Sequence, residues 1–87
     1  MFSERFQKNI QLTDHARQSM AKRDIDEGLV LEIIETGETN YKDDLHLWIY
    51  KHIPQRDDNL LCVAAVDAQA IIVKTVMTNW KIKELPK

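Results

Sequence analysis

The chain has 87 residues, of which 44% are hydrophobic and 30% charged, a size and balance that fit one folded domain and argue against disorder. No apolar run approaches the ~20 residues that a membrane-spanning helix needs, no signal peptide is evident, and a single cysteine excludes an internal disulfide, so we expect a cytoplasmic protein. With a net charge of −2, the chain lacks the excess of basic residues that is typical of nucleic-acid-binding proteins.

The elements begin with residues 1–11, whose mixed charge and weak periodicity predict an N-terminal arm or a short helical turn. A first helix is expected from Asp14 to Lys22, because Thr13 is a good N-cap and because Leu12, Ala16 and Met20 repeat every four residues.

A second helix is predicted after Asp26, another good N-cap, and Gly37 is a suitable residue to follow its end. Its apolar face consists of Leu29, Val30, Ile33 and Ile34.

After Gly37 the spacing of apolar residues changes from near four to two, which predicts strands. Residues 39–53 suggest a short strand, a turn at Asp43-Asp44 and a long strand. In the long strand one face carries Leu45, Leu47 and Ile49, and the other carries His46, Trp48, Tyr50 and His52. Residues 54–59 are expected to form a loop, and residues 60–66 and 70–78 to form two central strands, apolar on both sides.

This order predicts a single α+β domain over residues 1–87, in which two N-terminal helices pack on one face of a roughly four-stranded antiparallel sheet. Residues 81–87 are expected to be a tail. The outer face with His46, Trp48 and Tyr50 is apolar enough to need a cover. It fits stacking on bases, a homodimer contact, or burial by the arm or by the tail around Trp80.

The first helix carries the most unusual pattern of the chain, since His15 and Arg17 flank its buried stripe. A histidine at the rim of a helix–sheet contact is a candidate proton acceptor, but it also serves as a plain capping or packing residue. Arg17 and Arg23 are candidate phosphate ligands, and a solvated helix face paired to nearby acids is the alternative.

The fourth predicted strand places Lys74 and Thr75 within an apolar segment, either as ordinary strand residues or as members of a site. No paired ligand spacing predicts a metal site, and two glycines cannot build a phosphate-binding loop, so no metal or cofactor is expected.

The segment LTDHARQSMAKRDI, followed by a short helix, a glycine and strands ending in IIVKTVMT, resembles a small bacterial family of unknown function. That family's helix typically reads H-A-R-x-R-M-x-x-R-G-I, and the family is grouped with RelE-like toxins in the bacterial EndoU/colicin/RelE superfold. The resemblance covers about residues 12–80. Ser19 stands in place of the usual second arginine, and Asp24 in place of the usual glycine.

The resemblance implies a RelE-like fold and a metal-independent endoribonuclease, with an RNA substrate and an antitoxin protein as partners. Its expected catalytic set is His15 as base or acid, Arg17 and Arg23 as the phosphate clamp, and Lys74 or Thr75 in support. The other hypothesis is a non-enzymatic module that binds a protein or self-associates through the Trp48 and Tyr50 face.

Overall fold

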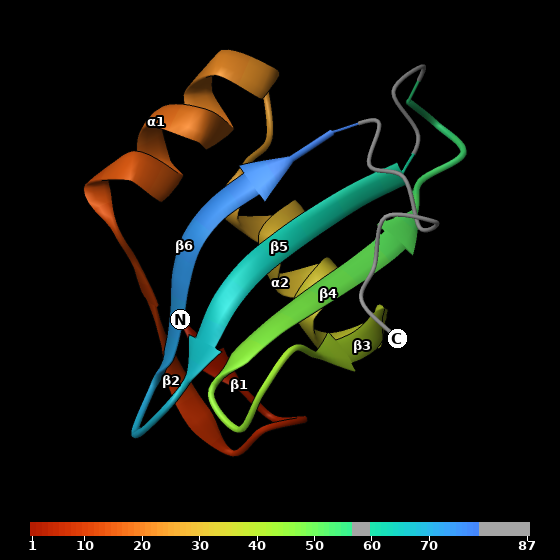
Figure 1. Cartoon of the computed structure of the whole chain (residues 1–87). Helices are drawn as coiled ribbons and strands as arrows, with labels where there is room; N and C mark the ends of the chain where they lie inside the picture. The colour runs from red at the N-terminus through yellow and green to blue at the C-terminus, as the bar shows by residue number, and fades with distance from the viewer. Residues whose placement is uncertain (57–59, 79–87) are drawn as a thin grey trace.

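The computed structural model describes residues 1–56 and 60–78. Within them, two helices lie between a pair of N-terminal strands and a run of four further strands (Figure 1). In chain order the elements are β1 (Phe2–Ser3), β2 (Lys8–Leu12), α1 (Asp14–Arg23), α2 (Glu27–Thr36), β3 (Glu38–Tyr41), β4 (His46–His52), β5 (Leu60–Asp67) and β6 (Ile71–Met77).

The six strands form one curled, mixed sheet in the order β1-β2-β6-β5-β4-β3. Strand β2 runs parallel to β6 and pairs Ile10 with Ile71 and Leu12 with Val73, while every other neighbouring pair is antiparallel. The predicted architecture, two N-terminal helices on a four-stranded antiparallel sheet, is therefore wrong. Two strands precede the helices, and one of them joins the sheet in parallel.

The physical reason lies in the composition of β2. Of its five residues only Ile10 is fully buried, so the strand carries too little apolar signal to stand out from a mixed-charge segment. Its pairing also depends on a partner about sixty residues later in the chain, which local periodicity cannot reveal. Residues 1–11, expected as an arm or a helical turn, contribute β1 and β2 instead.

Both helices begin as predicted. The Thr13 hydroxyl accepts a hydrogen bond from the Ala16 amide at 3.0 Å, and an Asp26 carboxylate oxygen accepts from the Leu29 amide at 2.8 Å. These side chains satisfy N–H groups that the first turn of a helix leaves without partners. At ten residues each, α1 and α2 are the described helices, and neither is long and apolar enough to cross a membrane.

Gly37 follows α2 for a reason of space. Its backbone is extended, with φ −75° and ψ 171°, so no left-handed conformation requires glycine here. A Cβ atom at this position would lie 2.6 Å from the Ile33 carbonyl oxygen and 2.7 Å from that of Tyr50. Both neighbours are backbone atoms, so the helix meets β4 at a distance that only glycine allows.

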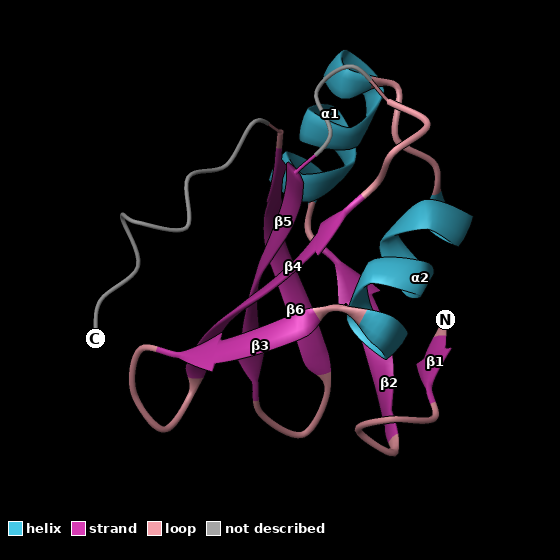
Figure 2. Ribbon diagram, turned by 90° about the vertical axis from the view of Figure 1, so that its right-hand side faces the viewer, coloured by secondary structure: helices cyan, strands magenta, loops and turns pink. Residues whose placement is uncertain are grey.

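The core lies between the helices and the inner face of the sheet, and Figure 2 shows α2 against that face. Leu47 and Ile49 of β4 point inward as predicted, but Leu45 lies in the preceding turn and is 49% exposed. The central positions of β5 and β6 are confirmed. Predicted features at Trp80, at the tail 81–87 and at residues 57–59 of the loop lie outside the described residues.

At one end of the sheet a polar network joins strands that are not neighbours. The Asp67 carboxylate accepts hydrogen bonds from the Lys8 ammonium and, at 2.6 Å, from the Tyr41 hydroxyl. Burial raises the pKa of Asp67, but these two hydrogen bonds and the lysine charge outweigh it, so the pKa is lowered. Burial and the hydrogen bond to Asp67 raise the pKa of Tyr41 to about 12.

Candidate functional site on the outer face of the sheet

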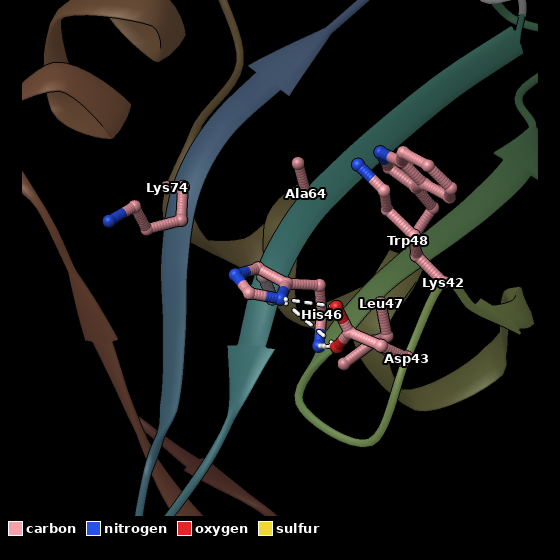
Figure 3. A pocket seen from close by; sticks show the side chains of 8 residues that line it. Lys42, Asp43, His46, Leu47, Trp48, Ala64 and Lys74 are labelled. Carbon is pink, nitrogen blue, oxygen red and sulfur yellow. Dashed lines mark hydrogen bonds and ion pairs between the residues drawn. The ribbon is translucent and has the colours of Figure 1, made fainter.

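The outer face of the sheet, which bears His46 and Trp48, contains a cavity of about 290 Å³ that we call the His46 cavity (Figure 3). No helix of the described residues covers this face (Figure 2). The cavity is lined by Lys42, Asp43, His46, Leu47, Trp48, Ala64, Ala65 and Lys74. Its volume is near the lower end of the range for small-molecule pockets.

Strand register creates the hollow. Trp48 of β4 pairs with Ala64 of β5. Because paired residues point to the same face, the small Ala64 side chain forms the floor beside the large indole. His46 lies two residues before Trp48, so its ring reaches the same face.

A β-bulge sets the wall on the β6 side. Ala64 pairs with Thr75 and Ala65 with Val73, which leaves Lys74 as the extra residue. Bulges redirect side chains and are frequent beside active sites. Here the bulge puts Lys74 among the residues that line the cavity.

The turn before β4 fixes the imidazole of His46. The Asp43 carboxylate accepts hydrogen bonds from the backbone amides of Leu45, at 2.9 Å, and His46, at 2.7 Å. Both of its oxygens also lie 3.0 Å from Nδ1 of His46. The two backbone bonds, together with the imidazole bond, lower the pKa of Asp43 to about 2. Asp43 is therefore a charged acceptor at neutral pH.

Two lysines complete the cavity from opposite sides. In Figure 3 the Lys42 ammonium group lies near the Trp48 indole, whereas the Lys74 ammonium group extends past β6, away from that ring. Both lysines are exposed, and the Trp48 side chain is half-buried. The cavity is thus lined by an indole and by the side chains of two flexible lysines.

The predicted site on α1 is not gathered in the same way. Ala16 is fully buried, and the exposed residues His15 and Arg17 lie on either side of it. Arg17 pairs with Glu27 at 3.4 Å and lines a different cavity of about 420 Å³, next to β2. His15 lines neither that cavity nor the His46 cavity.

Arg23 lies eight residues from His15, about 12 Å along the helix axis. It is half-buried, and its Nε atom has no hydrogen-bond partner within the described part of the chain. Its carbonyl oxygen accepts from Arg56 at 2.7 Å, and the carbonyl of Asp24 accepts from the same guanidinium at 2.9 Å. Arg56 thus caps the negative end of α1.

Thr75 contacts α1 instead of the cavity. Its hydroxyl lies 3.0 Å from the hydroxyl of Ser19, which is only 5% exposed. The pair satisfies two hydroxyl groups at the contact between α1 and β6. Of the predicted catalytic residues, only Lys74 lines the cavity together with His46 and Trp48. Tyr50 lies two residues after Trp48 in β4 and is not among the lining residues.

Sequence reasoning missed Asp43, Lys42 and Ala64 as site residues. The spacing of Asp43 and His46, three residues apart across a turn, was a usable signal, because an aspartate there accepts amide bonds from the residues that follow it. Nothing in the sequence indicated Ala64, because its place in the cavity depends on the register between β4 and β5. Cys62 is fully buried, and burial raises its pKa to about 12, so its thiol is inert.

Among residues 1–56 and 60–78, no three histidine, cysteine or acidic side chains are placed to hold a metal ion. A family model described as a domain of unknown function, DUF4258, matches residues 12–78. Neither a curated protein nor a solved structure matches the chain significantly. The matched segment includes every residue that lines the His46 cavity.

Proposed function

The chain belongs to the DUF4258 family, and we propose that it is a metal-independent endoribonuclease of the RelE-like toxin kind, acting at the His46 cavity. The observation that carries the proposal is the composition of this cavity, whose lining combines the imidazole of His46, the indole of Trp48 and two lysine side chains around a small apolar floor. In RNA cleavage without a metal, an imidazole can serve as the base and lysine side chains can supply positive charge.

The reaction is attack of a ribose 2′-hydroxyl on the adjacent phosphorus. A bond forms between O2′ and phosphorus, the bond from phosphorus to O5′ breaks, and a 2′,3′-cyclic phosphate and a 5′-hydroxyl result. A base must take the 2′ proton, cations must stabilise the extra negative charge, and an acid must protonate O5′. The two lysines supply positive charge, and Trp48 supplies a surface on which a base stacks, worth ~1–3 kcal/mol.

The placement of the α1 residues favours this cavity over the predicted helix site. Arg17 is paired to an acid, and Arg23 lies at the far end of the helix, so the expected phosphate clamp has no common focus with His15. Lys42 and Lys74, by contrast, line one cavity together with an imidazole. A toxin of this kind would act in the cytoplasm and be held inactive by an antitoxin protein.

The test is cleavage of an unstructured RNA oligonucleotide by the purified chain in the presence of EDTA. We expect products with 2′,3′-cyclic phosphate ends and no cleavage of the matching DNA, which lacks the 2′-hydroxyl. The double variant Lys42→Gln/Lys74→Gln should lower kcat/KM by about 10–100-fold, because each lost cation removes a charge-assisted bond to phosphate.

Lys22→Gln is the matched control, since it removes the same charge from an exposed position on α1. It should leave kcat/KM within about twofold of the wild-type value, since no contact to the substrate is lost. Absence of cleavage by the wild-type chain, or equal rates for the double variant and the wild type, would contradict the proposal.

A second candidate, a non-enzymatic module that binds a protein or a second copy of the chain, is favoured by exposed apolar residues at one sheet edge. Tyr41, the last residue of edge strand β3, is 45% exposed, and Leu45, in the turn after it, is 49% exposed. Exposed strand edges with apolar side chains favour association. A dimer that Leu45→Asp weakens, in a protein without ribonuclease activity, would support this function instead.

A further inference from the structure

We propose that Asp43 is the positioning residue of the reaction, and that it holds His46 in the tautomer whose Nε2 atom accepts the 2′-hydroxyl proton. This inference rests on the proposed ribonuclease function and adds to it the identity of the base and the group that prepares it. The geometry of the turn before β4 carries the argument.

The first step concerns the proton on the imidazole. An ionised carboxylate accepts hydrogen bonds but cannot donate them. Since both Asp43 oxygens lie 3.0 Å from Nδ1 of His46, that nitrogen must carry the hydrogen. In the neutral ring Nε2 then holds the lone pair, which makes it the basic atom.

The second step concerns direction. Nδ1 faces the turn, so Nε2, on the opposite side of the ring, points away from Asp43 and toward β6 (Figure 3). The charged groups that line the cavity around this ring are Lys42 and Asp43 from the turn and Lys74 from β6. A phosphate that approaches Nε2 would therefore lie away from the carboxylate, on the side of β6, where the flexible stem of Lys74 can reach it.

The third step concerns rigidity. Two backbone amides bind the same Asp43 carboxylate, and the Lys42 amide donates to the His46 carbonyl at 2.8 Å. The backbone of the turn thus already holds the carboxylate in place, so its bond to the imidazole costs little additional conformational entropy. A histidine base oriented by an acid that is itself held in place is also the arrangement of the catalytic triad.

The complete step is balanced without a cofactor. Nε2 of His46 takes the proton from the 2′-hydroxyl as O2′ bonds to phosphorus, and O5′ leaves with a proton from the Lys74 ammonium group. Lys74 is exposed on a flexible four-carbon stem, so it can turn toward the leaving oxygen. Solvent then restores the proton to Lys74 and removes it from His46.

The test is Asp43→Asn, with Asp44→Asn as the control from the same exposed turn. The asparagine oxygen keeps the two backbone bonds, but its NH₂ group can face Nδ1 and favour the other tautomer. We expect kcat for RNA cleavage to fall about 30-fold with KM unchanged, and Asp43→Glu to recover part of the loss. Asp44→Asn should match the wild type.

A direct reading of the tautomer accompanies the kinetics. ¹⁵N NMR of the histidine rings should show hydrogen on Nδ1 of His46 in the wild type, and on Nε2 in a substantial fraction of Asp43→Asn. Wild-type cleavage with an unaffected Asp43→Asn rate, or a wild-type His46 that carries hydrogen on Nε2, would overturn the inference and leave the proposed function standing. A wild-type chain that cleaves no RNA would overturn both.

Discussion

Helix α1 and the outer face of the sheet both carry a histidine with basic residues, yet only one of them gathers these groups. On α1 successive side chains turn by about 100°, so the exposed neighbours His15 and Arg17 diverge around the buried Ala16. On the sheet, His46 and Lys74 are 28 positions apart in the chain but line one cavity. Residues that are close in sequence thus need not share a site, and residues far apart in sequence can. Four predictions test this contrast between α1 and the outer face of the sheet.

The largest effect is expected from the two histidines. His46→Ala should lower the rate of RNA cleavage by about 10³-fold, within the range for loss of a general base. His15→Ala should change it less than threefold, because residue 15 lies outside the His46 cavity. Single-turnover kinetics with both variants, after circular dichroism shows that they fold, measure the contrast. A large loss in His15→Ala and a small one in His46→Ala would indicate that the active site lies on α1.

The next effect tests whether α1 contributes structure. Ser19→Arg places a charge at a site that is 5% exposed and removes the hydrogen bond to Thr75, so we expect a loss of about 3 kcal/mol in the free energy of unfolding. Gln18→Arg, at an exposed neighbouring position, should change it by less than about 0.5 kcal/mol. Urea denaturation measures both. Equal stabilities would show that α1 tolerates an arginine at position 19.

A smaller effect is expected from filling the cavity. Ala64→Leu should weaken binding of single-stranded RNA about 10-fold, or 1.4 kcal/mol, because the larger side chain occupies the floor beside Trp48. Ala21→Leu adds the same atoms to an exposed position on α1 and should leave the affinity unchanged. Fluorescence polarisation with a labelled oligonucleotide compares them. Unchanged affinity in Ala64→Leu would place the RNA elsewhere.

The smallest effect lies at the end of α1. Asp24 adopts a left-handed conformation, with φ 55° and ψ 51°, which glycine reaches without strain from a Cβ atom. Asp24→Gly should therefore raise the free energy of unfolding by about 0.5 kcal/mol. Asp24→Ala keeps the Cβ atom and should lower it. Thermal and urea denaturation give both signs, and a destabilising glycine would mean that the aspartate side chain stabilises this helix end.

The sequence predicted those parts of the fold that depend on neighbouring residues. Thr13 and Asp26 start helices because a hydroxyl or carboxylate meets an amide three residues later. The alternation of Leu47, Trp48 and Ile49 sets the faces of β4. Strand β2 was missed because its partner lies about sixty residues away and its own apolar content is low.

The same distinction applies to the site. His46, Trp48 and Lys74 were all named from sequence, but in separate hypotheses, because nothing local shows that β6 lies two strands from β4. Ala64 became visible only through the register that sets it between Trp48 and β6. His15 and the arginines were favoured by a contiguous pattern, which a helix distributes around its axis.

The extra residue in β6 has a consequence for how this domain tolerates change. On either side of it, Val73 and Val76 are both fully buried although they are three positions apart, a spacing that an unbroken strand would send to opposite sides. Removing one residue here would restore strict alternation and force a choice between the hydrophobic interior and the cavity wall. We therefore expect a one-residue deletion in this strand to destabilise the domain more than most single substitutions in it.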